Sequence, residues 1–134
     1  MNRLNQKKGF TLIEIIVVLI IVGVLASIAL PNLFQNIAKS KGAEALAQMG
    51  AMKSTIEACV QRNGGDSTNC ATLTALGLIS AQGSFSYVLS VSTSAGVWSL
   101  VASYNGLPSG VVSFSRTSSG AVTCTTTGAF AGVC

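Results

Sequence analysis

An almost uninterrupted apolar run near the start of the sequence limits what the chain can fold into. Between Phe10 and Leu30 the only charged residue is Glu14, and Ile, Val and Leu dominate the rest. As a helix that rises about 1.5 Å per residue, these roughly 21 residues span about 31 Å, close to the hydrocarbon thickness of a bilayer. The run therefore predicts one membrane-spanning helix.

Charge and cysteine content indicate how this span is oriented. Arg3, Lys7 and Lys8 precede the apolar run and should stay in the cytoplasm under the positive-inside rule. The remainder of the chain, which carries 4 cysteines, would then lie on the far side of the membrane, where disulfides can form. The sequence has no His, the commonest general base and metal ligand, so we expect no enzyme, no metal site and no cofactor.

Helical periodicity continues well beyond the apolar run. Apolar residues recur at helical spacing as far as Val60, and polar residues occupy the other face, where Lys53 and Glu57 are spaced as an i,i+4 ion pair. Asn63-Gly64-Gly65 then offers a C-terminal stop. The pattern predicts one long helix from Phe10 to about Arg62, with its second half amphipathic.

Two residues weaken the first half of this helix. Pro31 removes a backbone hydrogen bond inside it, and Gly23 is a poor helix former. The segment between them is a candidate soft spot. In a second interpretation, Pro31 simply marks the membrane edge, since both residue types are tolerated in membrane helices.

The composition changes after Gly65, where Ser, Thr and Gly dominate and apolar residues begin to alternate. We expect a short helical turn over residues 71–79, followed by about four antiparallel strands over 85–91, 96–103, 110–116 and 120–127. The apolar stripe from about Leu46 to Val60 must cover one face of this sheet. The expected fold class is α+β, a long N-terminal helix packed on a small antiparallel β-meander.

The segment Lys8-Gly9-Phe10-Thr11-Leu12-Ile13-Glu14 resembles the class III signal of bacterial type IV prepilins and of the related pseudopilins of type II secretion. The resemblance is close from Lys7 to about Pro31 and covers the remainder only in outline. It implies that a membrane prepilin peptidase cuts between Gly9 and Phe10 and methylates the new amino terminus. Gly9, without a side chain, would let the protease approach an extended backbone closely.

Glu14 is the next candidate functional residue. An ionised carboxylate in an apolar packing region costs several kcal/mol unless it is paired. The resemblance implies that its partner is the amino terminus of a neighbouring Phe10, a pairing that would set the register between subunits. The alternative is a carboxylate that reaches water at the membrane interface without a partner.

The resemblance implies a structural pilin with the following parts: a leader at 1–9, a membrane and assembly half of the helix at 10–30, its amphipathic half at 31–62, and a loop, sheet and disulfide-bounded C-terminal region at 63–134. The subunit would wait in the inner membrane with its head in the periplasm. It would then join a homo-oligomeric helical filament on the cell surface, served by an assembly platform and an outer-membrane secretin.

Adhesion, twitching motility and DNA uptake are the activities that such a filament implies. Nucleic-acid binding has little support, because Arg62 and Arg116 are too few for a phosphate-tracking groove in one subunit. A pseudopilin is the first alternative, although Asp66 is the only acid after Glu57, whereas the major pseudopilins resemble calcium binders. A secreted binding module, with a signal peptide cut near Ser27-Ile28-Ala29, is the second.

The four cysteines permit three pairings, and the sequence alone does not choose among them. We favour Cys59 with Cys70 and Cys124 with Cys134, since each pair closes a loop of about ten residues and pins a segment that would otherwise fray. The second pair resembles the disulfide-bounded C-terminal region of many pilins. A zinc site is the rival interpretation, but the wide spacing and the absence of His argue against it.

Overall fold

The computed structural model describes residues 9–92, 96–106 and 108–134. Most of the expected leader, including Arg3, Lys7 and Lys8, lies outside the described residues. The chain divides into two compact units, the first ending at Gln35 and the second comprising Asn36–Cys134.

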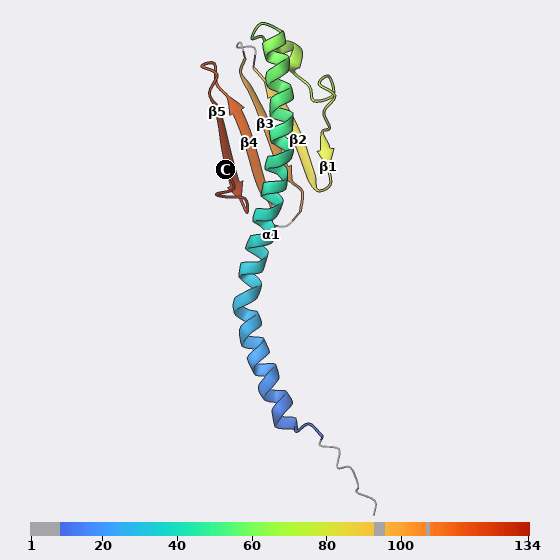
Figure 1. Ribbon diagram of the computed structural model, residues 1–134, viewed down its shortest axis with the longest axis vertical. Helices are drawn as coiled ribbons and strands as arrows, with labels where there is room; N and C mark the ends of the chain where they lie inside the picture. The colour runs from blue at the N-terminus through green and yellow to red at the C-terminus, as the bar shows by residue number, and fades with distance from the viewer. Residues whose placement is uncertain (1–8, 93–95, 107) are drawn as a thin grey trace, which may run out of the picture. The chain divides into compact units, whose positions relative to one another are not determined.

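Within the described residues one α-helix, α1, runs over Leu12–Arg62 (Figure 1). The prediction of one long helix is confirmed, with a start two residues after the expected Phe10. The helix ends where glycine permits a reversal: Gly64 and Gly65 have φ of 65° and 94°. The N–H of Gly65 donates to the carbonyl of Val60 at 2.9 Å, which satisfies one of the carbonyls left open at the helix end.

Five strands form one antiparallel sheet in the order β1-β2-β3-β4-β5 (Figure 1). Their bounds are Ala81–Gln82 for β1, Phe85–Val91 for β2, Trp98–Tyr104 for β3, Gly110–Arg116 for β4 and Val122–Gly128 for β5. The antiparallel meander is thus confirmed: β2 and β4 have the expected bounds, and β3 and β5 begin two residues later than expected. The two-residue strand β1 was not expected, because it is too short to show alternation.

The expected helical turn over residues 71–79 is present as hydrogen-bonded turns, in which the N–H of Leu76 bonds to the carbonyls of Thr72 and Leu73 at 3.4 and 3.1 Å, and it does not extend into a helix. A short 3₁₀ helix, η1, precedes it at Thr68–Cys70, and the expected segment itself is a series of turns. Gly77, with φ of 68°, interrupts any helix there, and the N–H of Leu78 closes the turn onto the carbonyl of Leu73 at 2.8 Å.

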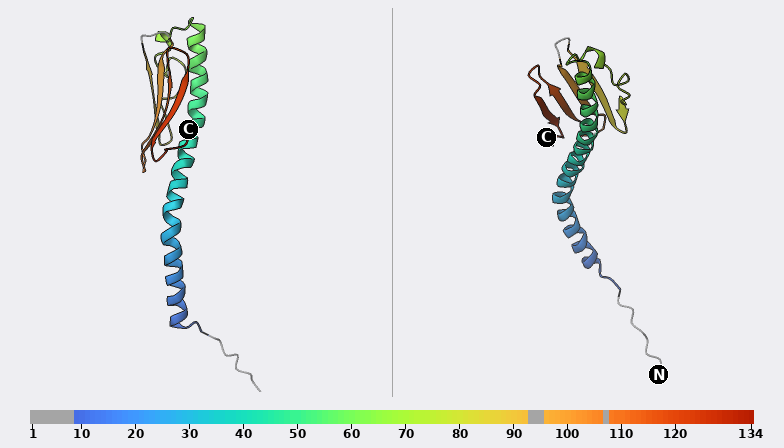
Figure 2. Two further views of the ribbon diagram at one scale, coloured as in Figure 1. Left: turned by 90° about the vertical axis from the view of Figure 1, so that its left-hand side faces the viewer. Right: turned by 45° about the horizontal axis from the view of Figure 1, so that its top comes forward.

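The core of the second unit lies between α1 and one face of the sheet, and Figure 2 shows this part of the helix running along the sheet. From Ala38 to Cys59 the buried helix residues recur every three or four positions, and Val60 is buried as well: Ala38, Gly42, Ala45, Met49, Met52, Ile56, Cys59 and Val60. The strands bury alternate residues, including Phe85 and Tyr87 from β2 and Trp98, Leu100 and Ala102 from β3. The prediction that the apolar stripe of the helix covers one face of the sheet is confirmed. The stripe begins two turns closer to the N-terminus than expected, at Ala38.

Phe130, which follows β5, is fully buried and fills the end of this core. A Cβ added at Gly42 on α1 would lie 3.1 Å from its ring, and one added at Gly110 on β4 would lie 2.7 Å from it. Both glycines therefore leave room for the aromatic ring, which anchors the C-terminal segment between helix and sheet.

Candidate assembly segment

The start of α1 is fixed by Thr11. Its hydroxyl accepts a hydrogen bond from the N–H of Glu14 at 3.3 Å, and its carbonyl accepts from the N–H of Glu14 and of Ile15. Thr11 is therefore the N-cap of α1. Thr-x-x-Glu is a capping-box pattern, so the sequence contained the signal for this role, but sequence reasoning did not use it.

Gly9 and Phe10 lie directly before this cap and are not helical. Both are exposed, and a Cβ added at Gly9 would meet nothing within 4 Å. The packing of this chain therefore gives no reason for a glycine at position 9.

Glu14 lies in the first turn of α1, where a carboxylate interacts favourably with the helix dipole. Its side chain is exposed, and no ion pair involves it among the residues that the structure describes. The structure thus places a carboxylate without a cationic partner five positions after Gly9, within an apolar segment.

Large apolar side chains surround Glu14 on every side of the helix. From Phe10 to Ile37 their exposed fractions lie between 47% and 82%, so in the described part of the chain none of them is buried. This helix is long and apolar enough to cross a bilayer, with a mean hydropathy of 3.0 in its most apolar window. An exposed apolar surface of this extent needs lipid or other protein around it.

Gly23 and Pro31 both lie inside α1, which continues through Pro31 without a break. Proline has no N–H, so the carbonyl of Ser27 lacks its helical donor. Two side chains bond to carbonyls nearby: the Ser27 hydroxyl donates to Val24 at 2.7 Å, and the Asn32 amide donates to Ile28 at 3.4 Å. The soft spot remains a prediction, with this altered bonding as its local basis.

The structure joins Cys59 to Cys70 and Cys124 to Cys134, the two pairs that the sequence favours. The first disulfide is buried and ties the end of α1 to η1, with Cα atoms 6.1 Å apart. The second joins β5 to the C-terminal residue, with Cα atoms 5.9 Å apart, and Cys134 is exposed. Within the described ranges no cysteine is free and no cluster could hold a metal.

The expected ion pair between Lys53 and Glu57 is wrong. Glu57 instead binds across to the sheet, where its Oε1 lies 3.2 Å from Nε of Arg116. Lys53 lies over the ring of Phe114, with Nζ 5.8 Å from the ring centroid. The sequence pattern could not show this, because the sheet brings a second cation to the carboxylate. The pairing also engages Arg116, one of the two arginines considered for nucleic-acid binding.

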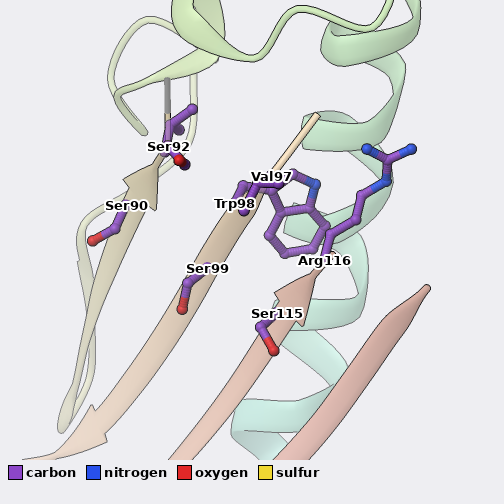
Figure 3. A pocket seen from close by; sticks show the side chains of 8 residues that line it. Ser90, Ser92, Val97, Trp98, Ser99, Ser115 and Arg116 are labelled. Carbon is purple, nitrogen blue, oxygen red and sulfur yellow. The ribbon is translucent and has the colours of Figure 1, made fainter. Parts of the chain in front are cut away.

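A pocket of about 290 Å³ lies beside Arg116, lined by Ser90, Val91, Ser92, Val97, Trp98, Ser99, Ser115 and Arg116. Figure 3 shows Trp98 and Arg116 directed toward α1, while Ser99 and Ser115 point to the opposite side of the sheet. Because the sequence has no His, these serines have no imidazole to activate them. The exposed helix is therefore a stronger candidate functional site than the pocket.

Comparison with known proteins identifies the family to which the chain is similar. The family model for the prokaryotic N-terminal methylation motif matches residues 4–30, and the model for pilin, a bacterial filament protein, matches residues 38–132. The chain is 43% identical over 56 residues to the type IV major fimbrial protein FimA of Dichelobacter nodosus, covering 42% of this chain and 36% of that protein.

Two further relatives carry different descriptions. Fimbrial protein Q of Moraxella bovis is 40% identical over 57 residues, covering 42% of this chain and 36% of that protein. The type II secretion system core protein G of Escherichia coli strain K12 is 39% identical over 57 residues, covering 42% of this chain and 39% of that protein. The matches thus span little more than a third of the length of these relatives. No solved structure matches the chain.

Proposed function

Because the chain belongs to the pilin family of bacterial filament proteins, we propose that it is a structural subunit of a type IV pilus. The observation that carries the proposal is the first part of α1, an apolar helix whose large apolar side chains from Leu12 to Ile37 are all at least 47% exposed. Such a surface suits two environments in turn, the inner membrane before assembly and the packed helices of neighbouring subunits afterwards.

Processing precedes assembly in this proposal. A prepilin peptidase removes residues 1–9 by cutting between Gly9 and Phe10, and Phe10 is then N-methylated. The position of the cap supports this step, since the scissile bond lies in exposed, non-helical chain just before Thr11. A protease that binds extended backbone need not unwind α1 to reach it.

Glu14 then aligns one subunit with the next. In the proposed filament its carboxylate pairs with the amino terminus of Phe10 of a second copy, because a charge surrounded by apolar side chains is costly unless it is paired. The same contact repeats along the fibre, and a head-to-tail contact that does not close produces an open helix. The segment from Gly23 to Pro31 would let α1 adjust as it leaves the bilayer.

The proposed location follows from this sequence of events. The subunit is held in the inner membrane with the disulfide-bonded unit in the periplasm, and it passes through an assembly platform and a secretin to the cell surface. Adhesion and motility are the roles that fit a surface fibre. DNA uptake has less support, because Arg116 already pairs with Glu57.

A type II secretion pseudopilin is the second candidate, and the similarity to core protein G favours it. Two features favour a pilin instead. The Cys124–Cys134 disulfide closes the C-terminal region, and the sequence has no acid after Asp66 with which to build a calcium site. Recovery of the chain in fibres sheared from the cell surface would support the pilin, whereas exclusive retention in the cell envelope would support the pseudopilin.

The test of processing is mass spectrometry of the intact protein and of its N-terminal peptide, after purification from native membranes or sheared fibres. We expect a mature start at N-methylated Phe10. A start at Leu30 would contradict the proposal and point to a secreted module. A Gly9→Val variant should keep its leader, while Gly50→Val, where an added Cβ also meets nothing within 4 Å, should be processed normally.

A further inference from the structure

The sequence contains two Asn-Gly pairs, Asn63-Gly64 and Asn105-Gly106, and the structure holds them in opposite ways. An asparagine before glycine is open to an intramolecular reaction, in which the backbone nitrogen of the glycine attacks the side-chain amide carbon. Glycine has no Cβ to hinder this approach. Whether the reaction proceeds depends on how the fold holds the two reacting groups.

At the first pair both groups are held by hydrogen bonds. The side-chain amide of Asn63 donates to the carbonyl of Cys59 at 2.9 Å and lies against the Cys59–Cys70 disulfide sulfurs at 3.5 and 3.6 Å. The N–H of Gly64 donates to the carbonyl of Gln61 at 3.2 Å. Attack would require both bonds to break at the C-terminal end of α1, so this asparagine is protected.

The second pair follows β3 and lies in the connection to β4. Asn105 is exposed, and within the described part of the chain no hydrogen bond involves its side-chain amide or the N–H of Gly106. Its backbone N–H alone is engaged, with the carbonyl of Ser84 at 2.9 Å. Neither the attacking nitrogen nor the side-chain amide is therefore held by a hydrogen bond to a described residue.

We propose that Asn105 is a site of spontaneous deamidation. The deprotonated nitrogen of Gly106 forms a bond to Cγ of Asn105, the bond from Cγ to Nδ2 breaks, and ammonia leaves. Water then opens the resulting succinimide at either carbonyl to give aspartate or isoaspartate. The net change is amide plus water to carboxylic acid plus ammonia, and it needs no enzyme and no oxidant.

Each event adds one negative charge to the surface of the second unit. In the isoaspartate product the backbone also gains a methylene between Cα of residue 105 and the peptide bond to Gly106, which lengthens the chain directly after the residue whose N–H bonds to Ser84. In a filament of many copies, the added charge would accumulate with the age of the fibre and change its surface electrostatics.

The test is peptide mass mapping of the full-length folded protein in detergent during incubation at mildly alkaline pH. Isoaspartate is identified by methyl transfer from S-adenosylmethionine with an isoaspartyl methyltransferase. We expect the Asn105 peptide to convert at least about tenfold faster than the Asn63 peptide, because two hydrogen bonds protect Asn63. Equal rates for the two peptides in the folded protein would overturn the proposal, as would an Asn105 that keeps its amide.

Two controls separate the effect of the fold from that of the sequence. After reduction and unfolding, the two Asn-Gly peptides should convert at similar rates, and persistent protection of Asn63 would contradict the role given to its hydrogen bonds. An Asn105→Gln variant should remove the acidic charge variant from isoelectric focusing gels of aged protein. Survival of that charge variant would place the modification at another residue.

Discussion

The indole Nε1 of Trp98 donates a hydrogen bond to Oε1 of Glu57 at 3.1 Å. The same carboxylate oxygen lies 3.2 Å from Nε of Arg116. One half-buried carboxylate on α1 therefore binds to both β3 and β4. It also satisfies the only polar atom of a tryptophan side chain that is 1% exposed.

Replacement of Glu57 by Ala should destabilise the second unit. It leaves the Trp98 N–H without its acceptor in a buried position and Arg116 without its counter-ion, at a cost of about 1–3 kcal/mol. Chemical unfolding followed by Trp98 fluorescence measures this change. Glu44→Ala is the matched control, since Glu44 pairs with Lys41 at 3.0 Å on the exposed side of the same helix. We expect less than about 1 kcal/mol there, and an equal loss in both variants would contradict the role of the cluster.

The contrast between Gly42 and Gly50 gives a second prediction. Both lie inside α1, so replacement by Ala brings each the same gain in helix propensity, about 1 kcal/mol. At Gly50 an added Cβ meets nothing within 4 Å, whereas at Gly42 it lies 3.0 Å from Val133 and 3.1 Å from Phe130. We expect Gly50→Ala to raise the melting temperature above that of the wild type. Gly42→Ala should melt at a lower temperature than Gly50→Ala, and thermal unfolding of the two variants measures the difference.

Phe130 provides the complementary test of the same contact. Its replacement by Ala empties the space between Gly42 and Gly110 and should cost about 3–5 kcal/mol. If Phe130→Ala lowers the free energy of unfolding by less than about 1 kcal/mol, the C-terminal segment is not anchored through this ring.

The sequence predicted the long helix, the meander and the face of α1 that covers the sheet, because each rests on a periodic pattern over many residues. It did not predict the anchoring of the C-terminal segment, since the approach of Phe130 to Gly42 joins positions far apart in the chain. The partner of Glu57 was missed for the same reason. Thr11 differs from both, because its capping pattern with Glu14 is local and can be recognised from the sequence alone.

The two disulfides should differ in both accessibility and stabilising effect. A mild phosphine reductant should open Cys124–Cys134 first, because Cys134 is exposed and Cys59 and Cys70 are buried. Removal of Cys124–Cys134 by double Ser substitution should cost about 2–3 kcal/mol, the value expected for a loop of about ten residues. Double Ala substitution at Cys59 and Cys70 should cost more, because it also removes packing from the core. Timed thiol labelling measures the order in which the disulfides are reduced, and denaturant unfolding measures the loss of stability in the two variants.

Asp66 provides a pH-dependent prediction. Its carboxylate accepts hydrogen bonds from the N–H of Thr68 at 2.9 Å and from the Thr68 hydroxyl at 2.7 Å. These bonds hold the pKa of Asp66 below its ordinary value of 3.8. Since the folded pKa is depressed, the stabilisation is present above the unfolded-state pKa and is lost as the pH falls through the folded value.

An NMR titration of the Asp66 carboxyl carbon measures this shift. Thr68→Ala removes the hydroxyl and should raise the pKa of Asp66 part of the way toward its ordinary value, since the backbone N–H remains. Thr74→Ala, which changes an exposed threonine that makes no hydrogen bond to Asp66 in the described residues, should leave the pKa of Asp66 unaltered. A titration that is the same in all three proteins would show that the Thr68 hydroxyl does not stabilise the carboxylate.

Glu14 provides the direct test of the proposed assembly. Glu14→Gln keeps the size of the side chain and removes its charge, so the amino terminus of the neighbouring Phe10 would be buried without a counter-ion, at several kcal/mol per contact. We expect the variant to enter the membrane and lose its leader but to yield at least about tenfold fewer sheared filaments, because the loss recurs at every subunit. Glu44→Gln, which removes an exposed carboxylate paired with Lys41, should assemble normally. Electron microscopy and immunoblots of sheared fractions provide the measurement, and normal filament yield from Glu14→Gln would refute the proposed pairing.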